Sequence, residues 1–389
     1  MTEAVINNAI YLDHNGTTPI APEAISAMTP FMAQHFGNPS STHALGATAK
    51  QGVTRAREDV AALLGCQPDE IIFTSGGTES NNMVLKGLVG FRQPSTFHLI
   101  TSAIEHPAIL NPALFLSELG AKVTILPVDA RGLIDPDQVR KAILPHTGLI
   151  SLMLANNETG TLQPIREVAE IAHDHNILLH TDAAQAVGKI SVQVKDLNVD
   201  FLSVAGHKLY GPKGVGALYM RKGLSLTPLI HGAGQENGKR AGTENTILTV
   251  GLGAACRVAR DRLSRDGEDI ARLRNHLQTL LFEGISGLVL NGHETKRLPN
   301  TLNVSVPGLE GGKILEGVPT VLASTGAACH DQRVTLSHVL SAMGVTPRVG
   351  MGALRFSLGR NNTMEEIEEA SRLIINQVRR MQDDPKHHP

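Results

Sequence analysis

The sequence predicts an α/β protein with a large domain built on a mixed, mostly parallel sheet between helices, and with a smaller α+β C-terminal domain. Three observations lead to this expectation. Short β-rich runs alternate with helical patterns from residue 70 to about residue 206, which is typical of a mainly parallel sheet. This alternation ends near residue 243. The length of 389 residues also exceeds what a single hydrophobic core usually serves.

The segments of the predicted large domain follow one another regularly. A β-rich run at 70–75 precedes a helical pattern at 81–91, and an apolar run at 200–206 closes the series. Between them, in order, are HLITSAIEH, NPALFLSELG, AKVTILPVD, DPDQVRKAIL, LISLMLANN, PIREVAEIAHDHN and ILLHTDAAQ. Because ligands of such sheets lie at the carboxyl ends of the strands, polar side chains at those ends are candidate site residues.

The pattern beyond residue 243 differs. Two long helices are expected at 246–263 and 268–285, followed by the short strands and final helix of TLNVSVPG, TVLAST, ALRFSLGR and MEEIEEASRLIINQVRRM. We therefore predict a large domain at 14–260, and a small α+β domain formed by 1–13 and 261–389.

The composition limits the classes of function. The net charge of −2 gives no indication of a nucleic-acid or membrane-surface partner, and no apolar run is long enough to span a bilayer. The start of the chain lacks the basic and apolar regions of a signal peptide. Cys66, Cys256 and Cys329 form neither a disulfide framework nor a metal-ligand pattern. We expect a cytoplasmic protein without a metal site.

Lys208 follows the apolar run DFLSVAG at a predicted strand end. A lone lysine usually extends its stem to solvent there. A buried lysine instead has a lowered pKa and can act as a nucleophile toward carbonyl groups.

Polar residues stand at the ends of other predicted strands. The turn SGGTESNN offers the helix N–H groups near Gly77 and Thr78 to an anion such as phosphate. HTDAAQ contains Asp182 and Gln185, while two further strand ends have His106 and Asn157. Each has a simpler explanation alone, such as a turn or a helix cap. Together with Lys208 they are the parts needed to hold pyridoxal phosphate.

The chain resembles the cysteine desulfurases and selenocysteine lyases of the class V aminotransferase group, which are pyridoxal-phosphate enzymes of fold type I with a seven-stranded sheet. The motifs that match in order over nearly the whole length are LDHNGTTP, GNPSSTH, FTSGGTESNN, EHPAI, NNETG, HTDAAQAVGK, GHKLYGPKGVGALY, RAGTEN, LPNTLN, STGAACH and ALRFSLGR.

The resemblance implies a role for each matching residue. Lys208 would bind the cofactor as a Schiff base, Asp182 would pair with the pyridine nitrogen, and Gln185 would contact the phenolic oxygen. His106 would stack on the ring and transfer protons. Gly77, Thr78 and His207 would contact the phosphate of the cofactor, and Thr243 would reach the phosphate of a second subunit. Asn157 and Arg355 would bind the substrate carboxylate.

Three departures from the family pattern concern the affinity for cofactor or substrate. Ala205 stands where bacterial desulfurases usually have a phosphate-binding serine. Asn237 stands where arginine is common, and HNGTTP replaces a more usual aromatic–small–Ala pattern.

Cys329 lies among small and polar residues in STGAACHDQ, a composition typical of a mobile, exposed loop. In the family, this thiol takes the sulfur or selenium atom of the substrate. His330 would lower the pKa of the thiol if it faced Cys329; facing solvent is an equally good interpretation. Cys256, and to a lesser degree Cys66, are interpreted as small packed side chains.

The principal hypothesis is a cysteine desulfurase that converts L-cysteine to L-alanine and an enzyme persulfide. A selenocysteine lyase is the alternative, and another class V aminotransferase is a weaker one. A cofactor-free binding protein is disfavoured by the joint presence of Lys208, Asp182 and His106. The resemblance also implies a homodimer with shared active sites and an acceptor protein for the sulfur or selenium.

Overall fold

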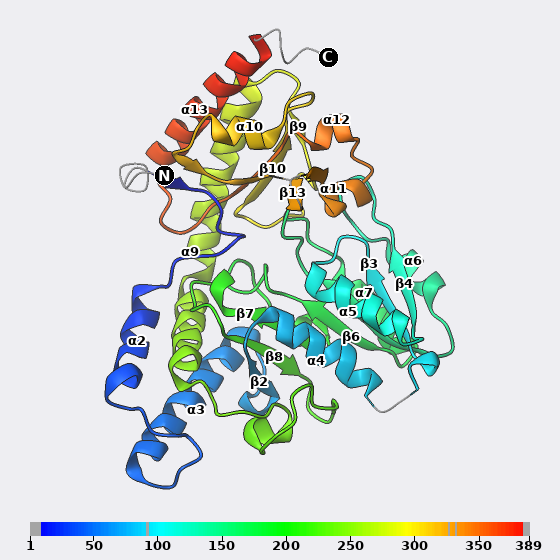
Figure 1. Cartoon of the computed structure of the whole chain (residues 1–389), viewed down its shortest axis with the longest axis vertical. Coiled ribbons are helices and arrows are strands. Elements are labelled where there is room, and N and C mark those ends of the chain that lie inside the picture. Colours follow the sequence, from blue (N-terminus) through cyan, green and yellow to red (C-terminus); the bar gives the residue numbers. More distant parts are fainter. Residues whose placement is uncertain (1–8, 91–92, 326, 331–332, 384–389) are drawn as a thin grey trace.

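The computed structural model describes residues 9–90, 93–325, 327–330 and 333–383, with the backbone alone for residues 327–330 and 333–334. Its lower part in Figure 1 is built on a seven-stranded sheet in the order β2-β8-β7-β6-β5-β3-β4. β8 is antiparallel to both neighbours and the other pairs are parallel, so the mixed, mostly parallel sheet is confirmed. The strands are β2 (Ile71–Thr74), β3 (His98–Ser102), β4 (Lys122–Leu126), β5 (Thr147–Met153), β6 (Leu178–Asp182), β7 (Phe201–Ala205) and β8 (Gly216–Met220).

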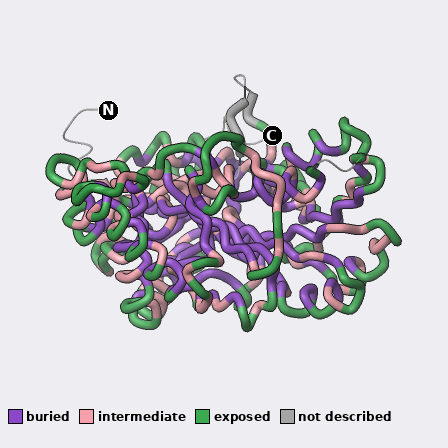
Figure 2. The backbone as a smooth tube through the Cα atoms, turned by 90° about the horizontal axis from the view of Figure 1, so that it is seen from below, coloured by how far each residue is buried: buried purple, intermediate pink, exposed green. Residues whose placement is uncertain are grey.

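Apolar residues on both faces of the strands bury this sheet between two helical layers. Successive residues point to opposite faces: Leu149 and Phe201 pack in one hydrophobic cluster, while Ile150 and Leu202 pack in another. Figure 2 shows the buried residues concentrated in this middle layer. The covering helices are α2 (Pro22–Ala33), α3 (Ala44–Leu64), α4 (Gly77–Val89), α5 (Pro107–Glu118), α6 (Pro136–Ala142), α7 (Ile165–Asp174) and α8 (Val194–Leu197).

A single helix, α9 (Thr246–Gly284), replaces the two long helices that the sequence predicts. The expectation of a break was wrong because residues 264–267 contain no proline, and Gly267 alone does not end a helix. Ion pairs one turn apart, Arg262–Asp266 and Arg265–Asp269, lie across the expected break. Figure 1 shows α9 running from the large sheet to the upper part of the molecule.

The upper part of the molecule in Figure 1 contains a four-stranded antiparallel sheet in the order β12-β15-β10-β9. The strand β1 (Ile10–Tyr11) joins this part by parallel pairing with β11 (Val321–Leu322). The other elements are β9 (Val289–Leu290), β10 (Thr301–Ser305), β12 (Ser324–Thr325), β15 (Ala353–Ser357), α10 (Gly311–Glu316), α11 (His338–Ala342), α12 (Pro347–Gly350) and α13 (Met364–Asp383).

A hydrophobic cluster of its own packs this upper sheet against α13 and the second half of α9. The proposed boundary at residue 260 falls within α9, and the division into two domains stays a prediction. No helix in the described ranges combines the length and apolar character needed to cross a membrane.

Candidate active site

A cavity of about 310 Å³ lies at the carboxyl ends of the parallel strands. Residues from the start of α4, the ends of β6 and β7, the segment after β3, and β15 surround it. Of the candidate residues, those that line it are Gly77, Thr78, His106, Asn157, Asp182, Gln185, His207, Lys208 and Arg355. The fold therefore brings together residues that are as far as 278 positions apart in the sequence, from Gly77 to Arg355.

Lys208 ends a short 3₁₀ turn, Gly206–Lys208, directly after the fully buried strand β7. Its Nζ donates hydrogen bonds to the main-chain oxygens of Asn15 at 2.6 Å and Gly16 at 2.7 Å. Burial, with a smaller effect of the nearby Arg355 cation, lowers the pKa of Lys208 to about 8. The unprotonated amine that a nucleophile requires is thus more populated near neutral pH than it is for an ordinary lysine.

The carboxylate of Asp182 is held from two sides at the end of β6. Oδ2 accepts a hydrogen bond from Asn81 Nδ2 at 2.7 Å, and Oδ1 accepts one from the Ala184 N–H at 3.0 Å. The side chain is buried, so its position is well fixed. The sequence analysis did not identify Asn81. The sequence pattern that could have indicated Asn81 is its spacing of four residues from Gly77, because this spacing puts both residues on one face of α4.

His106 is the N-cap of α5, and its Nδ1 accepts a hydrogen bond from the Ala108 N–H at 3.0 Å. Because a backbone N–H can only donate, Nδ1 is unprotonated and the proton of the neutral ring is on Nε2. The ring is exposed at the cavity, yet the surrounding protein lowers its pKa by desolvation. His106 can therefore exchange a proton at Nε2.

The start of α4 lies where the sequence predicts an anion site. Its N-cap is Gly76, whose φ of 152° favours glycine, and no side chain caps the first N–H groups. His207, whose pKa burial lowers to about 4, and Ala205 also line the cavity. Ala205 lies opposite Gly77, where an added Cβ would be 3.4 Å from the Ala205 Cβ.

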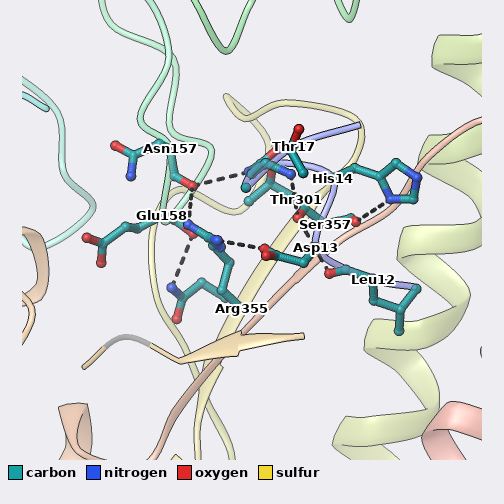
Figure 3. Close-up of polar contacts among 12 residues, drawn as sticks. Leu12, Asp13, His14, Thr17, Asn157, Glu158, Thr301, Arg355 and Ser357 are labelled. Carbon is teal, nitrogen blue, oxygen red and sulfur yellow. Dashed lines mark hydrogen bonds and ion pairs between the residues drawn. The ribbon is translucent and has the colours of Figure 1, made fainter. Parts of the chain in front are cut away.

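Arg355 connects β15 with the N-terminal segment and with the loop after β5, as Figure 3 shows. Its Nη2 pairs with Asp13 Oδ1 at 2.7 Å, and its Nη1 donates to the main-chain oxygen of Asn157 at 3.2 Å. The buried Nε has no hydrogen-bond partner among the described residues. A planar carboxylate can occupy this free donor, and Asp13, which the sequence analysis missed, then competes for the guanidinium.

Asn15, from the HNGTTP motif, is a third site residue, after Asn81 and Asp13, that was not predicted from the sequence. Its main-chain oxygen accepts hydrogen bonds from both Lys208 and Gln185 Nε2. Its side-chain amide donates to Thr301 Oγ1 at 2.8 Å. The unusual motif thus supplies the acceptor that holds Lys208 in this structure.

The departure from the family pattern at Asn237 has a conformational explanation. Asn237 has a φ of 55°, a left-handed conformation that asparagine adopts more readily than arginine. The preceding residue, Glu236, is fixed by a bidentate pair with Arg57 at 2.7 and 2.8 Å. Nearby Thr243 is exposed and lines a separate cavity of about 240 Å³ instead of the main one.

Cys329 lies in the strand β13 (Ala327–His330), which pairs antiparallel with β14 (Arg333–Leu336). The sequence predicted a loop here, and the backbone pairing corrects that expectation. The side chains of Cys329 and His330 lie outside the described residues.

The segment after β14 contacts the loops that follow β5 and β3, beside the main cavity. Ser337 donates to Glu158 Oε2 at 2.5 Å, and His338 Nε2 lies 2.9 Å from the main-chain oxygen of Glu105. Glu105 directly precedes His106. These contacts place the end of β14, the strand that pairs with β13, beside the loop that contains His106. As for the other two cysteines, Cys256 is fully buried and Cys66 is partly buried.

Comparison with known proteins gives consistent similarities. The sequence model of the aminotransferase class-V family matches residues 10–370. A cysteine desulfurase IscS of Dictyoglomus turgidum is 47% identical over 363 residues, which are 92% of this chain and 91% of that protein. One from Methanosarcina thermophila is 44% identical over 379 residues, 97% of this chain and 94% of that protein.

Solved structures are similar as well. A NifS-like protein superposes with a TM-score of 0.89 at 38% identity, over 95% of this chain and 99% of that one. The structure described as SspA in complex with cysteine superposes with a TM-score of 0.80 at 40% identity, over 91% of this chain and 99% of that one.

Proposed function

This chain belongs to the aminotransferase class-V family and is similar to its cysteine desulfurases over nearly its whole length, and we propose that it removes sulfur from L-cysteine with the residues that line the main cavity. The observation that carries the proposal is the meeting of Lys208, Asp182 and His106 around one cavity, from three different strand ends. The products are L-alanine and a persulfide on the enzyme.

The residues of the cavity fit pyridoxal phosphate, the cofactor of this family. Uncapped N–H groups at the start of α4 suit the phosphate, with Thr78 and His207 beside them. The buried carboxylate of Asp182 suits a protonated pyridine nitrogen. Gln185 Nε2 is a donor for the phenolic oxygen. The unpartnered Asn81 Oδ1 and Arg355 Nε are further buried polar atoms that a ligand can satisfy.

When bound, pyridoxal phosphate withdraws electrons from the substrate carbon atoms next to its amino group. Lys208 supplies the amine that holds the cofactor and then moves protons at the substrate. Asp182 keeps the pyridine nitrogen protonated, and His106 exchanges protons through Nε2. Arg355, together with Asn157, orients the substrate carboxylate.

The sulfur atom passes to Cys329. An S–S bond forms between its thiolate and the substrate sulfur while the C–S bond of the substrate breaks. The proton that completes the methyl group of alanine comes from a donor at the cavity, and the overall exchange is L-cysteine plus thiol to L-alanine plus persulfide. No external oxidant is required.

We extend the proposal to the assembly and location. A homodimer with shared sites is supported by Thr243, which is exposed and separate from the main cavity, so that a second subunit can use it. A reducing, cytoplasmic compartment suits the free thiols of Cys66 and Cys256. A protein that accepts the sulfur would have to approach Cys329.

The alternative activity, release of selenium from selenocysteine, is supported by the apolar Ala205 and the GAACH motif, which resemble those of selenocysteine lyases. Selenium is a better leaving group than sulfur, and a selenol is ionised at neutral pH. Its release therefore depends less on attack by Cys329 than the release of sulfur does.

Cys329→Ser tests these assignments. We expect the variant to lose nearly all alanine formation from cysteine and to keep part of it from selenocysteine, because serine cannot accept the sulfur. Alanine and the released chalcogen are measured for both substrates, with Cys66→Ser as the matched control at a cysteine that does not line the cavity. Full activity of Cys329→Ser on cysteine would contradict the proposal and favour elimination or transamination.

A further inference from the structure

Lys189 is a second lysine beside the cavity, and the proposed reaction does not use it. Its Nζ donates hydrogen bonds to Gln185 Oε1 at 2.7 Å and to Asn15 Oδ1 at 2.8 Å. No carboxylate in the described part of the chain pairs with it. Burial, together with the positive charges of Lys208 and Arg355, lowers the pKa of Lys189 well below its usual value. Burying an amine in such surroundings costs free energy compared with packing an apolar side chain at the same position.

The donor character of Lys189 determines how the amide of Gln185 is oriented. A lysine side chain has N–H donors in both protonation states, and as an ammonium it has no acceptor, so an oxygen atom is its preferred partner. Gln185 therefore turns Oε1 toward Lys189, and its NH₂ group points the other way, to the main-chain oxygen of Asn15 at 3.0 Å. The same oxygen accepts the hydrogen bond of Lys208. Lys189 thus fixes an amide next to the reactive amine.

We propose that Lys189 is a positioning residue, which holds Gln185 with its NH₂ group toward the phenolic oxygen of the cofactor. The inference rests on the proposed function, because it concerns the same cavity and pyridoxal phosphate. Without Lys189, Oε1 loses its donor and only the hydrogen bond to the main-chain oxygen of Asn15 still orders the amide, so a half-turn that presents Oε1 to the phenolic oxygen becomes less costly. Two acceptors would then face each other, and the hydrogen bond would be lost.

The orientation of this amide has a spectroscopic consequence. A hydrogen bond to the phenolic oxygen withdraws electron density from it, so that oxygen attracts the proton of the neighbouring imine nitrogen less strongly. Losing the donor therefore raises the pKa at which the visible band of the bound cofactor changes. Other charged or titratable groups act on the same centre and stay unchanged in the variants: Asp13, His106, Asp182, His207 and Arg355.

The test is a pH titration of the visible absorbance of the holoenzyme and of its variants. Lys189→Met and Lys189→Leu remove the donor, and each is expected to raise the pKa of the visible band by about one unit, a tenfold change in proton affinity. Lys189→Arg retains donors and should stay close to the wild-type value. Lys195→Met is the matched control, because this exposed lysine does not line the cavity.

A double-variant cycle separates positioning from a direct effect of charge. If Lys189 acts through Gln185, Lys189→Met should add almost nothing to the shift already caused by Gln185→Met. Equal shifts in both backgrounds would show that Lys189 acts by its charge, and would overturn the proposal. An unchanged pKa in Lys189→Met and Lys189→Leu would also overturn it, as would unfolding of all three Lys189 variants.

The two proposals fail in different ways. A wild-type protein that binds pyridoxal phosphate without forming a visible band would contradict the proposed function itself. A wild-type protein with a normal band, whose pKa does not respond to Lys189, would contradict the positioning role alone.

Discussion

Lys208→Ala is expected to abolish steady-state formation of alanine from cysteine, with a loss on the order of 10⁴-fold or more, as for other obligatory nucleophiles. The amine that would hold the cofactor covalently is also the group that moves protons at the substrate. In the structure its Nζ lies within the cavity, with a pKa lowered to about 8. Alanine is measured after the variant has been supplied with excess pyridoxal phosphate.

The same variant has a chemical readout. Borohydride should remove the visible band of the wild-type protein and attach the cofactor to the peptide that contains Lys208, and it should attach none in Lys208→Ala. Lys213→Ala, at an exposed lysine five residues further on, is the control and should behave as the wild type. Turnover by Lys208→Ala at the wild-type rate would mean that another group is the nucleophile.

Asp182→Ala is expected to lower the rate by on the order of 10² to 10⁴-fold, the range of positioned acid–base and electrostatic contributions. Without the carboxylate, the pyridine nitrogen loses its proton and withdraws electrons poorly. Asp182→Asn keeps the size of the side chain and part of its contacts but removes the negative charge. A loss of rate comparable to that of Asp182→Ala would therefore show that the charge is responsible. The rate is measured by single-turnover alanine formation on protein with a known cofactor content.

A matched control exists at Asp129, a carboxylate that does not line the cavity, where Asp129→Asn should not change the rate. A normal rate in Asp182→Ala with full cofactor content would show that another residue pairs with the pyridine nitrogen.

The large sheet could be predicted because its signals are local. Each strand is a short apolar run; Asp182 ends one of them and Lys208 stands three residues after another, so their position at the cavity follows from the strands. The confirmed mixed sheet and the shared cavity both depend on this regularity.

The missed features depend on contacts between distant segments. Asp13 meets Arg355 and Asn15 meets Lys208 only after the N-terminal segment has folded back between the two sheets. Both residues belong to the LDHNGTTP motif, but nothing in that motif assigns a contact to either of them. The continuity of α9 was missed for a different reason: the polar residues around Gly267 interrupt the apolar pattern, yet they pair along one helix face.

The central claim is that sulfur leaves cysteine as a persulfide on Cys329 while the carbon skeleton becomes alanine. The most direct test is a single turnover of the wild-type holoenzyme with limiting cysteine, followed by alkylation and mass spectrometry of the peptide that contains Cys329. The account predicts one alanine for each Cys329 that has gained one sulfur atom. Pyruvate and ammonia without added sulfur, or alanine with the sulfur on no cysteine, would contradict it.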